Sequence, residues 1–312
     1  MYPSIEPYQH GYLDSGDGHQ IYWELCGNPQ GKPVVFLHGG PGAGCSSHHR
    51  QLFNPELYNI LLFDQRGCGR SKPTASLENN TTQHLIADME RLRKEILKAD
   101  KWLVFGGSWG STLALAYAQS HPEYVAGLIL RGIFTLRKEE IKWFYQEGAS
   151  FVFPDKWESY LAPIPVNERD DLVSAYHRRL TGTDEEEKLR CAYAWANWED
   201  GTISLLDTNN KALSLKDKEA VLSFSRIENH YFVNKGFMDE GQLIRDAHLL
   251  AEIPTVIIQG RYDMCTPSKT AWDLHKAMPH AEFHLIPDAG HAFNEPGILN
   301  ALLKATDKFS TL

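Results

Sequence analysis

The sequence predicts an α/β fold, with a mostly parallel central sheet, helices on both faces and a helical block inserted in the middle of the chain. Short apolar runs of strand type recur along the chain. Amphipathic helical patterns separate most of the later runs, and this alternation is typical of a parallel sheet that is covered on both sides. The alternation stops over residues 135–245 and then resumes, which indicates an insertion.

The predicted strands are short apolar runs of the kind found in buried sheets. They lie at residues 21–25, 34–37, 60–63, 103–105, 128–130, 255–258 and 282–286. Residues 15–18, Ser-Gly-Asp-Gly, form a turn signal ahead of the first run. We therefore expect the sheet to open with an antiparallel hairpin.

The predicted helices follow the 3.6-residue period. In the core they include residues 85–97 and the Ala/Leu-rich residues 112–119. The insertion carries aromatic and charged helical patterns at residues 141–148, 169–180, 185–197 and 216–232. We divide the chain into a first core segment, 1–134, a helical cap, 135–245, and a second core segment, 246–312.

Composition limits the classes of protein that the chain can represent. The 312 residues are 42% hydrophobic and 23% charged, as expected of a globular protein. No stretch approaches the roughly 18 apolar residues of a membrane span. The amino terminus lacks the features of an export signal, so we expect a cytoplasmic protein. A net charge of −9 without clustered Lys and Arg argues against nucleic acid as a partner.

Cysteine and histidine spacing argues against structural disulfides and metal sites. The five cysteines are odd in number and form no C-x-x-C pair, so we expect reduced thiols. The histidines show no H-E-x-x-H or similar spacing. We expect neither a metal ion nor a cofactor.

A serine stands on an abrupt corner between a strand and a helix. The strand-like residues 102–105 are followed by Gly-Gly-Ser-Trp-Gly at 106–110 and then by the helix. This G-x-S-x-G arrangement is the nucleophile elbow of α/β hydrolases, and small neighbours tolerate the strained backbone that it imposes on the serine. The sequence therefore predicts Ser108 as a nucleophile in an α/β-hydrolase fold. A glycine-serine turn that merely caps a helix is the alternative for the pentapeptide alone.

Candidates for the other members of a catalytic triad follow the two last predicted strands. In this fold the order along the chain is serine, acid, histidine. Asp263 follows the strand at 255–258, and His291 follows the strand at 282–286. Asp288 also lies near, but it precedes the histidine on the same loop, where a turn-capping role suits it better.

A glycine-rich loop, Leu-His-Gly-Gly-Pro-Gly at 37–42, follows the strand at 34–37. The fold supplies one oxyanion amide from this loop and the other from Trp109, the residue after the nucleophile. A phosphate-binding loop is the competing interpretation, but no Lys-Ser/Thr pair follows the glycines.

Five motifs together resemble the prolyl aminopeptidases, also called proline iminopeptidases. They are HGGPG at 38–42, DQRGCGRS at 64–71, GGSWGSTLALAYAQSHPE at 106–123, GRYD at 260–263 and GHAFNEP at 290–296. The resemblance spans the whole chain and implies removal of an amino-terminal proline from short peptides without a cofactor. It also implies Ser108, Asp263 and His291 as the triad, with the amides of Gly40 and Trp109 as the oxyanion hole.

The resemblance further implies that acidic cap residues bind the free amine of the substrate. Glu199 and Glu228 match those positions. A partly buried carboxylate distinguishes a charged amine from an amide nitrogen, because an uncharged nitrogen leaves it unpaired. Phe134 and Tyr145 resemble residues of the family's proline-ring pocket, although helix-packing aromatics fit them equally well. Cys265 lies two residues after the predicted acid, where an inert buried thiol is the simplest interpretation.

Other functions compete with this hypothesis. A broader aminopeptidase or an esterase could use the same triad, because the cap sets the choice of substrate. A non-catalytic receptor on this fold would not need the complete triad that the sequence supplies. Dehalogenases and epoxide hydrolases place an aspartate at the elbow, where this chain has Ser108. We expect a monomer, while the sequence leaves the oligomeric state open.

Overall fold

A computed structural model describes residues 1–206 and 217–311, and within them eight strands form one sheet. The order across the sheet is β1-β2-β4-β3-β5-β6-β7-β8. The first strands pair antiparallel, as the predicted hairpin requires, and from β4 onward the pairs are parallel. The bounds are β1 Gln9–Asp14, β2 Gln20–Gly27, β3 Lys32–Leu37, β4 Tyr58–Phe63, β5 Trp102–Gly107, β6 Val125–Arg131, β7 Thr255–Gly260 and β8 Glu282–Ile286.

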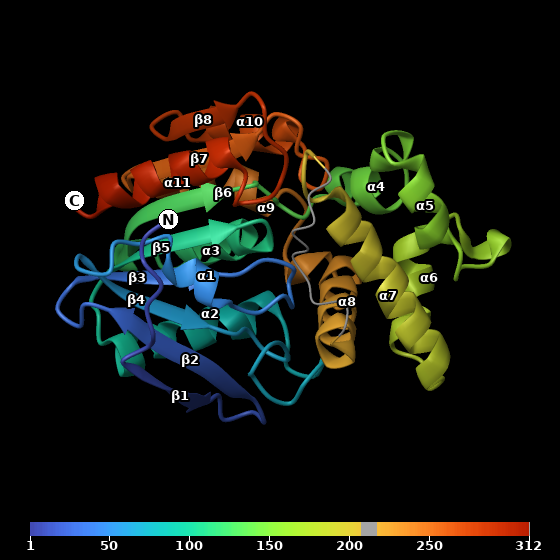
Figure 1. Ribbon diagram of the computed structural model, residues 1–312, viewed down its shortest axis with the longest axis horizontal. Helices are drawn as coiled ribbons and strands as arrows, with labels where there is room; N and C mark the ends of the chain where they lie inside the picture. The colour runs from blue at the N-terminus through green and yellow to red at the C-terminus, as the bar shows by residue number, and fades with distance from the viewer. Residues whose placement is uncertain (207–216, 312) are drawn as a thin grey trace.

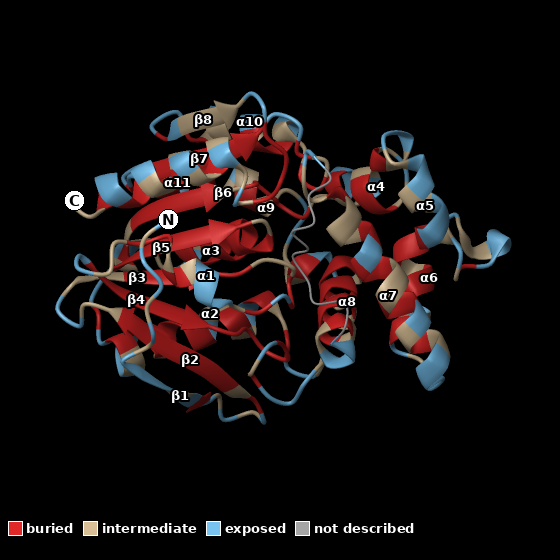
Figure 2. Ribbon diagram, viewed as in Figure 1, coloured by how far each residue is buried: buried red, intermediate tan, exposed pale blue. Residues whose placement is uncertain are grey.

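Two apolar clusters, one on each face of the sheet, hold the core together. Every residue of β4 and β5 is buried, which is why their sequences, apart from Asn59, lack polar residues and do not alternate (Figure 2). Side chains of α2, α3 and α10 belong to one cluster, and side chains of α11 belong to the other. The core helices are α1 Ser47–Arg50, α2 Thr82–Arg91, α3 Trp109–Ser120, α9 Gln242–Arg245, α10 Ser268–Ala277 and α11 Pro296–Phe309, and a π-helical segment, Leu92–Leu97, continues α2.

The inserted helices form a block to one side of the sheet (Figure 1). They are α4 Lys138–Tyr145, α5 Pro154–Leu161, α6 Leu172–Leu180, α7 Glu185–Thr202 and α8 Lys218–Val233. Short 3-10 turns lie at Pro122–Tyr124, Ala149–Phe151, Val166–Glu168, Lys235–Phe237 and Ala247–Leu250. Residues 207–216, which include the first residue of the predicted 216–232 helix, lie outside the described part of the chain.

Two features of this block differ from the expectation. Helix α5 was not predicted, because it is short and lies between prolines, Pro154 at its start and Pro163 just beyond its end. At the other end of the predicted cap, α9 packs against α3 and α10, so the last residues of the 135–245 segment lie on the core.

Helix α8 joins the cap to the core. The Ser223 hydroxyl donates a hydrogen bond to the carbonyl of Gly67 (2.7 Å), and the Tyr231 hydroxyl donates one to the Asn80 side chain (2.8 Å). The Tyr231 ring also packs edge-on against Trp109, with 4.7 Å between centroids. The cap therefore rests directly on the segment that follows the predicted nucleophile.

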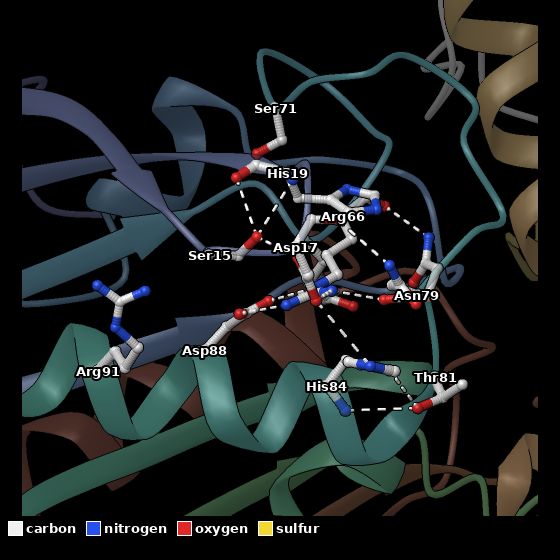
Figure 3. Close-up of polar contacts among 12 residues, drawn as sticks. Ser15, Asp17, His19, Arg66, Ser71, Asn79, Thr81, His84, Asp88 and Arg91 are labelled. Carbon is white, nitrogen blue, oxygen red and sulfur yellow. Dashed lines mark hydrogen bonds and ion pairs between the residues drawn. The ribbon is translucent and has the colours of Figure 1, made fainter.

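A buried arginine ties the opening hairpin to α2 (Figure 3). The Arg66 guanidinium donates two hydrogen bonds to the Asp88 carboxylate, at 2.6 and 2.8 Å, and a third to Asp17 on the hairpin turn, at 2.7 Å. Burial by itself would raise the pKa of Asp17. The hydrogen bond from Ser15, and then the hydrogen bond and charge of Arg66, outweigh this effect and lower the pKa to about 2. The antiparallel edge is thus anchored to the parallel sheet.

None of the described helices is long and apolar enough to cross a bilayer.

Candidate active site

Ser108 occupies the corner between β5 and α3 with a strained backbone. Its φ is 58° and its ψ is −127°, outside the regions that L-residues favour. The glycines around it leave no room for side chains. A Cβ on Gly106 would lie 2.1 Å from the carbonyl oxygen of Gly110, and one on Gly110 would lie 2.1 Å from that of Leu37. The local sequence therefore folds as a nucleophile elbow.

Asp263 lies on the loop after β7 and is almost completely buried. Its Oδ2 accepts hydrogen bonds from Nδ1 of His291 (2.7 Å), from the Gln259 side chain (3.0 Å) and from the Thr266 hydroxyl (2.9 Å). Its Oδ1 accepts one from the Thr266 amide (2.8 Å). These donors compensate the buried carboxylate for lost water, and they fix its orientation toward the histidine.

His291 lies on the loop after β8, and two neighbours hold its backbone. The Arg131 guanidinium donates to its carbonyl oxygen (2.8 Å), while its own amide donates to the carbonyl oxygen of Ile203 (3.0 Å). Its Nδ1 is engaged by Asp263, so Nε2 is the nitrogen available to act as a base. Within the described residues the Ser108 hydroxyl makes no hydrogen bond to this ring. Such bonds are often long before substrate binds, and the roles of the three residues stay a prediction.

The glycine-rich loop lies against the elbow. A Cβ on Gly39 would lie 3.4 Å from that of Ser108, so this loop passes directly beside the serine. Gly40 has a φ of 104°, in the region that favours glycine. Trp109 is the first residue of α3, where a helical amide has no partner within the helix. The placement is compatible with the predicted oxyanion role of Gly40 and Trp109.

Gln65 links the glycine-rich loop to the elbow. Its side-chain nitrogen donates to the carbonyl oxygen of His38 (3.0 Å), and its side-chain oxygen accepts from Nε1 of Trp109 (2.9 Å). Its backbone amide donates to Nε2 of His38 (3.0 Å). Burial lowers the pKa of His38 and so favours the neutral ring that this last bond needs. The two segments that carry the predicted oxyanion amides therefore share one buried side chain.

Glu199 on α7, which is partly exposed, and Glu228 on α8, which is buried, form an acidic pair in the cap. Glu199 accepts a very short hydrogen bond from the Tyr145 hydroxyl, and Glu228 accepts one from Nε1 of Trp195 (2.6 Å). Burial raises the pKa of Glu199 to about 7, although the Tyr145 hydrogen bond opposes this shift. Burial and then the charge of Glu199 raise the pKa of Glu228 well above its ordinary value. With the site empty, the pair holds a proton more tightly than two separate carboxyls would.

Aromatic rings surround the acidic pair. Tyr145 stacks on Trp195, with 4.5 Å between centroids, and also contacts Phe232 at 5.2 Å. Phe134 meets Phe232 edge-on at 5.7 Å. The predicted ring-pocket residues Phe134 and Tyr145 thus both contact Phe232. The Tyr145 hydroxyl also orients Glu199, a role that the sequence did not predict for Tyr145.

Cys265 lies beside the triad, and the charges of the acidic pair act on its thiol. Its sulfur, a ring nitrogen of His291 and a carboxylate oxygen of Asp263 lie within 4.8 Å of one another. Burial and then the charge of Glu199 raise the Cys265 pKa well above its ordinary value, and Glu228 adds to the shift. These three residues are close enough for a metal ion, but a protonated thiol and an already hydrogen-bonded Asp263 suit a triad better. The acidic pair and the triad therefore border the same region.

Comparison with known proteins first supports the fold. Residues 32–297 match the family described as alpha/beta hydrolase fold. An esterase from Exiguobacterium antarcticum superposes with a TM-score of 0.67 at 19% identity, covering 97% of this chain and 100% of the esterase. A bromoperoxidase from Bacillus anthracis superposes with a TM-score of 0.68 at 16% identity, covering 97% of this chain and 100% of the bromoperoxidase. At such low identity these structures support the fold alone.

Curated relatives give a narrower result. The proline iminopeptidase of Xylella fastidiosa strain 9a5c is 55% identical over 99% of each chain. The proline iminopeptidase of Arabidopsis thaliana is 53% identical over 100% of this chain and 82% of its own. That of Neisseria gonorrhoeae is 49% identical over 98% of each chain. The chain belongs to the proline iminopeptidase family. The expectation drawn from the five motifs is confirmed.

In this member of the proline iminopeptidase family, sequence reasoning missed several residues that hold the site together. They are Gln65, Arg131, Gln259, Thr266, Phe232 and Tyr160. Gln65 lies in the DQRGCGRS motif and Arg131 directly follows the predicted strand at 128–130, so position offered a signal for both. Tyr160 has a fully buried hydroxyl without a hydrogen-bond partner among the described residues, and its ring lies 6.0 Å from Trp195. It belongs to α5, for which the sequence pattern gave no signal.

Proposed function

We propose that the protein is a serine aminopeptidase that releases an amino-terminal proline from short peptides. The observation that carries the proposal is the acidic pair of Glu199 and Glu228, which lies among aromatic rings. The Thr202 hydroxyl bonds to the Glu199 carbonyl oxygen and contacts the sulfur of Cys265, which lies beside the triad. Membership in the proline iminopeptidase family supports the same substrate class.

Acylation begins when the Ser108 oxygen attacks the carbonyl carbon of the terminal proline. His291 takes the serine proton on Nε2, and Asp263 stabilises the imidazolium through Nδ1. The amides of Gly40 and Trp109 bind the oxyanion. The C–N bond then breaks, His291 returns the proton to the leaving amine, and a prolyl ester of Ser108 remains.

Deacylation repeats these steps with water. His291 takes a proton from the water as it attacks the ester carbon, and the proton passes to the Ser108 oxygen when the C–O bond breaks. Free proline is released and the enzyme returns to its starting state. No cofactor enters either half of the reaction.

The acidic pair selects the substrate by charge. The two carboxylates repel each other in the empty site, and a bound ammonium group relieves this repulsion. An acetylated nitrogen carries no positive charge and leaves both carboxylates uncompensated. The pair therefore favours a free amino terminus, and the surrounding rings provide an apolar slot for the proline ring.

The decisive experiment compares hydrolysis of proline anilide with its N-acetylated form and with alanine and leucine anilides. We expect the wild type to cleave the free-amine proline compound fastest and the Ser108→Ala variant to be inactive. Equal cleavage of the acetylated compound would mean that the acidic pair does not read the amine. The protein would then be a broader hydrolase, and the assignment of the cap residues would fail while the triad assignment would remain.

A further inference from the structure

The loop of His291 is attached to the cap through the end of helix α7. The His291 amide donates to the carbonyl oxygen of Ile203 (3.0 Å). Glu295 strengthens the junction: its Oε2 accepts from the Gly290 amide (2.6 Å), and its Oε1 accepts from the Leu205 amide (2.8 Å). One carboxylate thus bridges the residue before the histidine and the segment that follows α7 in the cap.

The bridge is not a by-product of helix capping. Glu295 is the N-cap residue of α11, yet its side chain makes no hydrogen bond to that helix. An N-cap side chain ordinarily accepts from the amides of the first turn. Here both oxygens are turned away from α11 and occupied by the two amides of the junction.

The segment that Glu295 holds also carries the predicted amine reader. Glu199 lies four residues before Ile203, in the last turn of α7. In the same turn the Thr202 hydroxyl bonds to the carbonyl oxygen of Glu199 (3.1 Å) and contacts the Cys265 sulfur at 3.8 Å. One short stretch of chain therefore touches the amine site, the neighbourhood of the triad and the histidine loop.

We propose that Glu295 is a positioning residue, which locks the His291 loop to the end of α7 so that the histidine and the amine site keep a constant separation. This inference rests on the proposed function. An exopeptidase cuts at a set distance from the amine that it binds, so an error in the position of its base is costly. A misplacement of about 1 Å can reduce a rate by about 100-fold.

Gly290 provides an independent way to break the junction. A Cβ at this position would lie 2.8 Å from the Leu205 nitrogen and 3.1 Å from Oε1 of Glu295. Alanine would push the two segments apart without altering any charge. Glu295→Gln keeps the size of the side chain but places an NH2 group against one of the two amides, so one bond is lost.

The test measures kcat and KM for proline anilide in the wild type, Glu295→Gln and Gly290→Ala. The control is Glu252→Gln, which alters an exposed carboxylate on the core. We expect kcat to fall about tenfold in both junction variants, with KM within about twofold of wild type, and no change in the control. Thermal melting establishes that the variants are folded. A loss that appears in KM alone, or turnover within twofold of wild type in both junction variants, would overturn the proposal.

A second readout separates this inference from the proposed function. A fluorophosphonate reagent without an amine labels an activated serine whatever the peptide specificity. We expect both junction variants to label Ser108 about tenfold more slowly than the wild type and the control. If the wild type labels but does not cleave proline anilide, the proposed function fails and the labelling rates still decide the role of Glu295. Equal labelling rates in all four proteins would reject that role.

Discussion

Asp263 in the core and Glu228 in the cap are equally buried, with 3% and 2% of their surfaces exposed, but their surroundings are opposite. Asp263 accepts hydrogen bonds from His291, Gln259 and Thr266. Within the described part of the chain Glu228 accepts one hydrogen bond, from Trp195, and it faces the charge of Glu199. The difference teaches that two equally buried carboxyls can have opposite surroundings, hydrogen-bond donors around one and a second carboxyl beside the other.

This contrast separates two tasks. The core carboxylate is fully supplied with donors and is ready to orient the histidine before substrate arrives. The cap carboxyls have fewer donors, and under the proposed function we expect the ammonium group of the substrate to be their missing partner. Each of the following substitutions alters one side of this comparison.

The largest effect is expected for Asp263→Asn. The NH2 group of the new amide can donate a hydrogen bond to Nδ1 of His291. This favours the tautomer that carries its proton on Nε2, the nitrogen that must act as the base. We expect kcat to fall by about 10⁴, the magnitude seen for the equivalent change in another serine peptidase. Steady-state kinetics with proline anilide measure it. A loss below about tenfold would show that the donors around Asp263 do not serve the triad.

The next effect is expected for Glu228→Gln. Removing one partner of a buried charge pair commonly costs 2–5 kcal/mol, so we expect kcat/KM for proline anilide to fall by roughly 100-fold. Labelling of Ser108 by a fluorophosphonate should remain within about twofold of wild type, because that reagent has no amine. Parallel losses in both assays would place Glu228 in the general architecture rather than in amine recognition.

A smaller effect is expected for Gln65→Leu. The substitution leaves the carbonyl of His38 and Nε1 of Trp109 without their shared partner, and it loosens the two predicted oxyanion segments. We expect kcat to fall by about tenfold, below the 10²–10³ reported for loss of a direct oxyanion donor, with KM nearly unchanged. A rise in KM without a change in kcat would contradict this role.

The smallest effect concerns stability and pH. The Glu199 pKa rises from 4.5 in the unfolded chain to about 7 in the folded protein. The folded state therefore binds more protons than the unfolded state between these values, and stability falls as pH rises through this window. Glu199→Gln should remove the loss and raise the melting temperature at pH 8 by a few degrees, roughly 2–4 °C per kcal/mol. At pH 4 the two proteins should melt alike, and a variant that is less stable at pH 8 would refute the shift.

The sheet and the elbow could be predicted because their signals are local. Most strands are short apolar runs, and the G-x-S-x-G motif places Ser108 at the corner through the steric needs of Gly106 and Gly110. The order of Asp263 and His291 after the last two strands followed from the fold. Helix α5 was missed because its short pattern is flanked by prolines and it is stabilised by contacts with the rest of the cap.

The sequence by itself determined the α/β architecture, the elbow and, through its motifs, the proline iminopeptidase family. Only the tertiary structure decided that Glu199 and Glu228 share a buried site, that Gln65 joins two loops, and that Glu295 attaches the histidine loop to the cap. The physical reason is the separation along the chain over which each kind of interaction acts. Strand periodicity and turn sterics act between neighbours in the chain, whereas desolvation and hydrogen bonding act between groups that only folding brings together.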